Sequence, residues 1–273
     1  MPILPVRGID LYYEQHGSGR VILFSSGLGG KGAYWQAQVE DMSRDHKVIV
    51  FDQRGVGLSG SAEPPFSISG LGRDVIALMD ALRIETVIFV GHSTGGAVGQ
   101  WLAANHGDRF AAMVLSATWT AMDARLRVMF ETRKATLLGL GAEEYVRQSL
   151  LWTYPPDWFD AAEGRLADIV RTMASDLTAT RVLEGRLDAI LQSDHGDCHI
   201  APGLPVLVTY ADDDYLIPQR YSLAVAANIP GAQQMCLTSG GHHFPQTRAK
   251  QFNTLVRRFL SEVDTARTDR TRL

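Results

Sequence analysis

The sequence predicts an α/β protein with a mostly parallel central sheet and helices on both faces of that sheet. Short, almost continuously apolar runs alternate along the chain with stretches of helical period. Strands that are buried on both faces have this composition. A chain of 273 residues, 45% of them hydrophobic, is long enough to bury such a sheet in one large domain or two small ones. The alternation of strands and helices is typical of an open sheet with two covered faces.

Each expected element follows from one of these patterns. The segments ILPV and IDLYYEQ flank Arg7-Gly8 and predict an antiparallel hairpin. Six further strands are expected at VILFSS, KVIVFD, TVIFVG, FAAMVLSA, PVLVTYA and AQQMCLTS. Helical periods predict helices over residues 34–44, 68–82, 94–106, 219–228 and about 245–260.

The alternation stops between about residues 122 and 198. This stretch is mostly helical in period, is rich in Arg, Ala and Leu, and contains the aromatic cluster LLWTYPPDWF. It is too long for a loop. We therefore expect residues 122–198 to form a helical cap, or lid, inserted after the sixth strand. Residues 1–121 and 199–273 then form the core domain.

The composition bears on partners and location. A net charge of −4 without a long block of one sign gives no reason to expect nucleic acid or a membrane surface as a partner. No signal-peptide pattern or apolar run of about 18 residues is present, so we expect a soluble cytoplasmic protein. Cys198 and Cys236 form neither a disulfide framework nor a metal-type spacing. The sequence leaves open whether the protein is a monomer or a homo-oligomer.

Ser93 stands where a buried strand is expected to turn into a helix. The segment Gly91-His92-Ser93-Thr94-Gly95 fits the G-x-S-x-G pattern, in which a nucleophilic serine is held on a strained strand-to-helix turn. Glycines are needed because the backbone on the two sides of such a turn passes close together. The following helix offers free N–H groups to a developing oxyanion. The alternative, a phosphate-binding glycine turn, lacks the Lys-Ser/Thr end of a P-loop and the dinucleotide-binding spacing.

A serine nucleophile needs a base to take its proton. The pair His242-His243 follows the last expected strand, so we expect one of these two histidines to be the base. His92 is expected to point away from the serine hydroxyl. Four more histidines lie in expected loops or at helix ends, where a solvated surface role is expected: His16, His46, His106 and His195.

An acid is then needed to orient the base. Asp212, Asp213 and Asp214 all follow the expected strand PVLVTYA, and we expect only one of them to face the histidine. Asp123 is a weaker candidate, after the preceding strand. The order along the chain is then serine, aspartate, histidine.

Together these residues resemble the α/β-hydrolase fold superfamily over nearly the whole chain. SSGLGGKGAYW stands where the family has His-Gly-x, and FDQRGVGLS is similar to its Asp-x-Arg-Gly-x-Gly-x-Ser turn. GHSTGG, ADDDYLIP and SGGHHF take the positions of the serine, acid and histidine. The resemblance implies that Asp214 is the acid, that His242 is the base, and that the backbone N–H groups of Leu28 and Thr94 form the oxyanion hole. The chain departs from the family at Ser26, where a structural histidine is usual.

Within the superfamily, four segments most resemble the aminoacrylate (carbamate) hydrolases of pyrimidine utilisation: SGLGGKGAYW, FDQRGVG, the YPPDW of the cap and the GGH. The chain is also similar to enol-lactonases and to cofactor-free esterases known as non-haem haloperoxidases. The resemblance implies a serine hydrolase that cleaves a small carboxylic ester, lactone or amide/carbamate-type substrate, with no metal or organic cofactor. Two alternatives remain: a C–C bond hydrolase of a meta-cleavage-type diketone, and a non-catalytic small-molecule receptor.

The substrate pocket is expected to involve aromatic side chains from several segments. Most aromatics of the cap are expected to pack against one another. The pocket candidates are Tyr34, Trp35, Trp119, Trp152, Trp158 and His243. Asp52 and Arg54 are expected to form a structural turn. Four residues close together in sequence resemble a metal site in composition only, and no metal is expected there: His195, Asp197, Cys198 and His199.

Overall fold

Eight strands form one sheet in the computed structural model, which describes residues 2–193, 200 and 202–271. The strand order is β1-β2-β4-β3-β5-β6-β7-β8, with β1 and β2 antiparallel to their neighbours and every other pair parallel. The strands are β1 (Ile3–Val6), β2 (Ile9–His16), β3 (Val21–Ser25), β4 (Lys47–Phe51), β5 (Val87–His92), β6 (Phe110–Ser116), β7 (Val206–Ala211) and β8 (Gln233–Leu237). The predicted strands and the mostly parallel sheet are therefore confirmed.

The central strands are apolar throughout because both faces of the sheet are covered. Every residue of β5 is buried. Its side chains alternate between two cores: Phe89 belongs to one hydrophobic cluster, and Ile88 and Val90 belong to the other. β5 pairs with β3 on one side and with β6 on the other, so its carboxyl end lies near the middle of the sheet.

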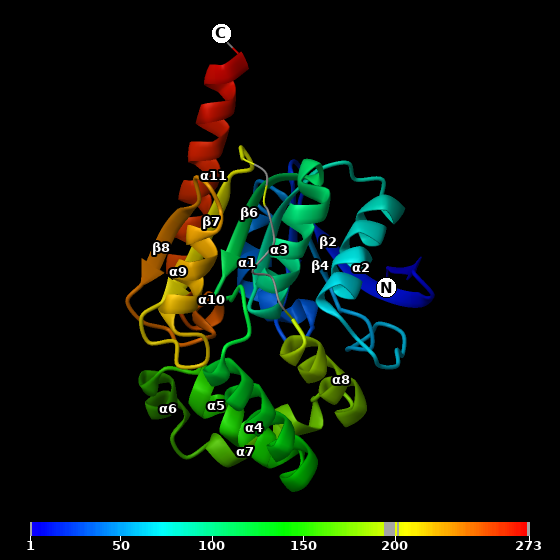
Figure 1. Cartoon of the computed structure of the whole chain (residues 1–273), viewed down its shortest axis with the longest axis vertical. Helices are drawn as coiled ribbons and strands as arrows, with labels where there is room; N and C mark the ends of the chain where they lie inside the picture. The colour runs from blue at the N-terminus through cyan, green and yellow to red at the C-terminus, as the bar shows by residue number, and fades with distance from the viewer. Residues whose placement is uncertain (1, 194–199, 201, 272–273) are drawn as a thin grey trace.

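Helices cover the two faces, as Figure 1 shows. One face is covered by α2 (Ile68–Ala81), α3 (Thr94–His106) and α9 (Gln219–Ala227), whose apolar residues share one cluster. The other face is covered by α1 (Gln36–Met42) and α11 (Ala249–Thr271). Short helical turns also occur at η1 (Gly32–Trp35) and η2 (Gly107–Arg109).

The last predicted helix is interrupted. A single helix was expected over about 245–260, whereas the structure has a short α10 (Phe244–Thr247) and then α11. The backbone leaves the helical region between them, at Arg248. The side chain of Arg248 bonds instead to Ser239 Oγ and to the carboxylate of Asp157. These two contacts join the start of α11 to the loop after β8 and to α6.

In the described part of the chain between β6 and β7, five helices lie beyond the end of the sheet where β6 ends (Figure 1). They are α4 (Ala124–Leu140), α5 (Ala142–Thr153), α6 (Pro156–Ala162), α7 (Leu166–Ser175) and α8 (Thr180–Leu191), and are called the inserted helices below. Their position agrees with an insertion after the sixth strand, and the division into domains at residues 122 and 198 stays a prediction. Across the described ranges, none of the helices is both long and apolar enough to cross a membrane.

Candidate active site

Ser93 lies on a strained turn between β5 and α3. Its backbone has φ 55° and ψ −115°, a conformation that L residues rarely adopt. A Cβ atom on Gly91 would lie 2.2 Å from the carbonyl oxygen of Gly95, and one on Gly95 would lie 2.2 Å from the carbonyl oxygen of Ser25. Both positions therefore require glycine. The Ser93 N–H donates to the carbonyl of Ser116, 2.8 Å away, which ties the turn to the end of β6.

His242 and Asp214 form a buried pair at the same edge of the sheet. Nδ1 of His242 lies 2.8 Å from Oδ2 of Asp214, and each residue is only 3% exposed. The other carboxylate oxygen of Asp214 accepts the N–H of Ile217 at 2.8 Å, which fixes the orientation of the carboxylate. A carboxylate at Nδ1 favours the tautomer that has its proton there. Nε2 of His242 is then the nitrogen that can accept a proton.

The other acidic candidates have different partners. Asp213 accepts the N–H groups of Gly240 and Gly241, at 3.0 and 2.8 Å, and so holds the loop that leads to His242. Asp212 lies 3.5 Å from the thiol of Cys236. Asp123 caps α4 and accepts the hydroxyl of Tyr221. Among these four aspartates, Asp214 is the one that contacts an imidazole.

Two free N–H groups flank the serine. A Cβ atom on Gly27 would lie 3.2 Å from Cβ of Ser93, so the loop that carries Leu28 passes directly beside the serine. Thr94 begins α3, where the helix dipole is positive. Within the part of the chain that the structure describes, neither the Leu28 N–H nor the Thr94 N–H has a hydrogen-bond acceptor. Both donors are therefore available to a ligand.

His92 packs behind His242, a contact that the sequence did not predict. The two imidazole rings are 4.7 Å apart, and the His92 ring stacks on Tyr34 at 5.2 Å. Nδ1 of His92 lies 3.1 Å from Oγ of Ser116. Burial, together with His242 and His243, holds the pKa of His92 well below its ordinary value. The neutral imidazole of His92 therefore packs against the ring of His242.

His243 lies beside the aromatic side chains of Tyr34 and Tyr154. Its Nδ1 is 3.4 Å from the hydroxyl of Tyr34, and its ring is 4.9 Å from that of Tyr154. Burial, assisted by the charges of His242 and Arg133, lowers the pKa of His243 to about 3. His243 is therefore neutral at pH 7.

The predicted pocket aromatics occupy different environments. Trp35 and Trp119 are fully buried, and each belongs to one of the two hydrophobic clusters. The indole N–H of Trp119 donates to Ser193 Oγ at 3.3 Å. Trp152 and Trp158 are partly buried, and the Trp158 ring lies 4.1 Å from that of Tyr154. Their contact with a substrate stays a prediction.

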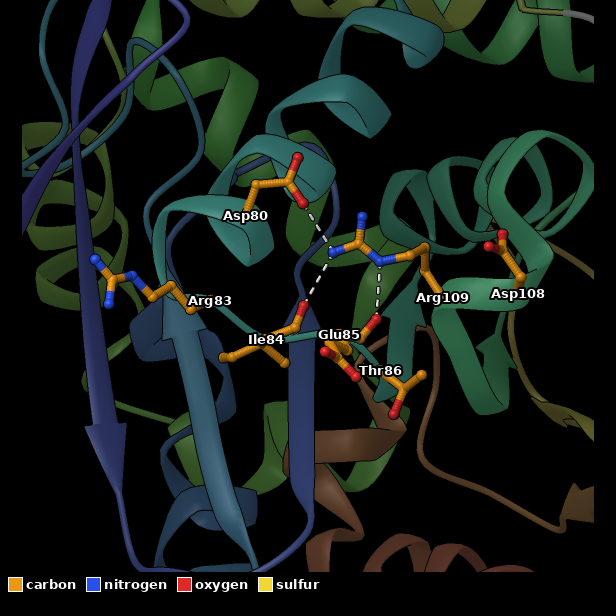
Figure 2. Close-up of a pocket in the computed structure, with 7 residues that line it drawn as sticks. All are labelled: Asp80, Arg83, Ile84, Glu85, Thr86, Asp108 and Arg109. Atoms are coloured by element: carbon orange, nitrogen blue, oxygen red, sulfur yellow. Dashed lines mark hydrogen bonds and ion pairs between the residues drawn. The ribbon is translucent and has the colours of Figure 1, made fainter.

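A depression of about 500 Å³ lies at the opposite edge of the sheet, where β5 and β6 begin. Figure 2 shows that Arg109 points across it toward Asp80. Arg109 bonds to the Asp80 carboxylate and to two backbone carbonyls, those of Ile84 and Glu85. Its charge is already paired, and this depression does not adjoin the serine turn.

The predicted turn at Asp52 is structural. Its carboxylate accepts the N–H groups of Gly32 and Leu58, at 2.8 and 2.9 Å. Arg54 pairs with the buried Asp74. The group resembling a metal site, His195, Asp197, Cys198 and His199, lies outside the described residues. Within the described ranges, no set of three or more His, Cys, Asp or Glu side chains is arranged to hold a metal ion.

Comparison with known proteins places this geometry in a family. The model of the alpha/beta hydrolase fold family matches residues 20–248. A protein of Azorhizobium caulinodans named "Putative carbamate hydrolase RutD" is 34% identical over 264 residues, which cover 97% of this chain and 100% of that protein. The enol-lactonase of Burkholderia xenovorans LB400 is 26% identical with a TM-score of 0.84, covering 95% of this chain and 100% of that one. A hydrolase from Pseudomonas aeruginosa is 28% identical with a TM-score of 0.85, covering 95% and 97% of the two chains. The chain belongs to the α/β-hydrolase fold family and is a hydrolase enzyme on that fold.

Proposed function

We propose that this hydrolase is a serine hydrolase that cleaves a small carboxylic ester, lactone or amide/carbamate-type substrate through an acyl-enzyme. The observation that supports this most is the buried His242–Asp214 pair, 2.8 Å between Nδ1 and Oδ2, on the sheet edge where Ser93 occupies its strained turn. A serine after β5, a carboxylate after β7 and an imidazole after β8 are the groups that acyl transfer to water requires.

In the proposed cycle, the hydroxyl of Ser93 attacks the substrate carbonyl carbon while Nε2 of His242 takes its proton. Asp214 holds the imidazole in the required tautomer and stabilises the imidazolium that forms. The oxyanion accepts the N–H groups of Leu28 and Thr94, each donor contributing about 3–4 kcal/mol to transition-state stabilisation. The tetrahedral intermediate collapses when the imidazolium gives its proton to the leaving oxygen or nitrogen.

Water then completes the cycle. His242 takes a proton from a water molecule, whose oxygen attacks the acyl carbon of the ester on Ser93. The second tetrahedral intermediate releases the acid, and the proton returns from His242 to Ser93. The inserted helices follow β6 directly, so in this proposal they cover the site and select the substrate.

The similar proteins support a carbonyl substrate. One relative bears the name carbamate hydrolase, and one structural neighbour is described as an enol-lactonase. Carbamates and enol-lactones both contain a carbonyl carbon bonded to a heteroatom leaving group. The proposal therefore covers this bond class and does not single out one member of it.

The test combines turnover with active-site labelling. Short p-nitrophenyl esters, lactones, carbamates and enamine-type acids are assayed in parallel, and Ser93 is probed with a fluorophosphonate. We expect turnover in at least one of these classes and complete labelling of Ser93. Labelling without turnover in any class would instead favour C–C bond hydrolysis of a diketone. Absence of both would contradict the serine mechanism.

A further inference from the structure

Arg186 is a buried cation without a carboxylate partner. It lies on α8, is 2% exposed, and forms no ion pair among the residues that the structure describes. Its Nη1 is buried and has no hydrogen-bond partner there either. Desolvating a guanidinium without a counter-charge is costly, so the hydrogen bonds that Arg186 makes must offset that cost.

The guanidinium reaches out of the inserted helices to the loop beside Ser93. Nε of Arg186 donates to the carbonyl of Leu28 at 2.8 Å, and Nη2 lies 3.4 Å from the carbonyl of Gly27. Nη2 also donates to Oε1 of Gln53. The amide of Gln53 in turn donates to the carbonyl of Ser26 at 2.8 Å. Three consecutive loop carbonyls thus accept from one Arg186–Gln53 pair.

These contacts fix the direction of the Leu28 N–H. The peptide between Gly27 and Leu28 is trans, so its carbonyl and its N–H point in opposite directions. The carbonyl of Gly27 accepts the N–H of Gly30 at 3.1 Å and the Nη2 of Arg186 at 3.4 Å, so the Leu28 N–H is directed away from both donors. The Cα of Gly27 lies against the serine, since a Cβ atom there would be 3.6 Å from Oγ of Ser93.

The guanidinium also strengthens this N–H as a donor through its 3.4 Å contact with the Gly27 carbonyl, whereas the 2.8 Å bond to the Leu28 carbonyl acts on the next peptide and holds the loop. A cation that hydrogen-bonds to a peptide carbonyl polarises the peptide and makes its N–H more acidic. Burial lowers the pKa of Arg186 to about 10, so the guanidinium stays protonated at neutral pH. The positive charge therefore persists beside these carbonyls at pH 7.

The departure at Ser26 agrees with this arrangement. The hydroxyl of Ser26 is buried and has no hydrogen-bond partner among the described residues, so this side chain does not hold the loop. The loop is held instead by Gln53 from one side and Arg186 from the other. Arg186, which is 158 positions away in sequence from Leu28, therefore supports this loop from the inserted helices.

We propose that Arg186 is a positioning residue of the oxyanion hole, through which the inserted helices hold and polarise the Gly27–Leu28 peptide. This inference rests on the proposed serine mechanism, because it assigns the Leu28 N–H as an oxyanion donor. Substrate recognition and catalysis are then coupled, since displacement of α8 would also release the peptide that stabilises the transition state.

The test compares Arg186→Gln and Arg186→Lys with the control Arg133→Gln. Arg133 is also a buried arginine of the inserted helices, 6% exposed, but its Nη2 bonds to Tyr145 and Ser149 within those helices. The substrate is neutral p-nitrophenyl acetate, and the transition-state probe is a neutral trifluoromethyl ketone, which forms a tetrahedral adduct with the serine. Thermal unfolding is measured for every variant.

In Arg186→Gln, we expect kcat and the affinity for the trifluoromethyl ketone to fall together by about 10- to 100-fold, with KM nearly unchanged. Arg186→Lys keeps the charge but reaches fewer carbonyls, so about a 3- to 10-fold loss is expected. Arg133→Gln is expected to lose a similar amount of thermal stability and to keep kcat within about threefold of wild type.

Two results would overturn the proposal. If both Arg186 variants lose thermal stability but keep wild-type kcat and ketone affinity, the residue only supports the fold. If the loss lies in KM and is confined to carboxylate-bearing esters, Arg186 binds substrate charge and does not position the peptide. Failure of the serine mechanism is recognised separately, because the wild-type protein would then neither react with a fluorophosphonate nor hydrolyse the ester.

Discussion

Nδ1 of His242 lies 2.8 Å from Oδ2 of Asp214, whereas among the described residues the adjacent Asp213 bonds to backbone N–H groups of the loop before His242. Two neighbouring carboxylates thus have separable tasks. One contacts the imidazole directly, and the other shapes the loop that delivers it. This separation allows a matched pair of substitutions one residue apart.

Asp214→Asn is expected to lower kcat by about 10⁴-fold with little change in KM. An asparagine amide can donate to Nδ1 and so favours the tautomer with its proton on Nε2, which cannot accept the proton of Ser93. Asp213→Asn removes only loop hydrogen bonds, so a loss of thermal stability with less than about tenfold loss of kcat is expected. Steady-state kinetics with any ester that the enzyme hydrolyses checks both predictions. Equal losses of kcat in the two variants would contradict this assignment.

Gly95→Ala is expected to prevent stable folding or to displace the serine turn. The new Cβ atom would lie 2.2 Å from the carbonyl oxygen of Ser25, which is backbone and cannot rotate away. Gly139→Ala is the control, because a Cβ atom there meets nothing within 4 Å on an α-helix. It is expected to raise the free energy of unfolding by about 0.5–1 kcal/mol. Urea denaturation measures both, and a Gly95→Ala protein with wild-type stability and activity would contradict the close approach of this turn to Ser25.

His243→Gln is expected to reduce the acid sensitivity of the fold. The pKa of His243 is lowered to about 3, so the unfolded chain binds this proton near pH 6.5 while the folded chain does not. The protonation of His243 therefore costs no stability above about pH 6.5, and the folded state becomes less stable as the pH falls from there toward about 3. One such histidine lowers the free energy of unfolding by about 1–2 kcal/mol when the pH falls from 7.5 to 5.

Denaturant titrations of wild type and His243→Gln at these two pH values measure the difference. The variant should lose less stability on acidification than wild type does. An unchanged pH dependence would show that His243 is protonated at its ordinary pKa in the folded protein.

Hydrophobic periodicity was sufficient to predict the strands and their burial, because both faces of the sheet are covered and each central strand is apolar throughout. The turn at Ser93 was predictable for a related reason. The glycines at positions 91 and 95 are required because the backbone passes close to them, and the pattern that shows this spans only five residues of sequence. By contrast, Asp213 and Asp214 are adjacent on one turn, so the residue types alone left both open, and only the resemblance to the family implied Asp214.

The role of Arg186 was not accessible from the sequence. Its partners Leu28 and Gln53 are 158 and 133 positions away, and an arginine in an amphipathic helix is ordinarily a solvated residue. The packing of His92 behind His242 was hidden for a similar reason, since it depends on how two strand ends approach each other. The break at Arg248 likewise follows from contacts with α6 and with the loop after β8.

The proposed mechanism depends above all on Ser93 being the nucleophile, and mass spectrometry of the protein after reaction with a fluorophosphonate tests this directly. We expect one covalent adduct per chain, located on the peptide that contains Ser93. The adduct should be absent in Ser93→Ala and should form more slowly by orders of magnitude in His242→Ala, with loss of hydrolysis in both. Hydrolysis that persists at the wild-type rate in Ser93→Ala, or an adduct on a different residue, would contradict the assignment of Ser93.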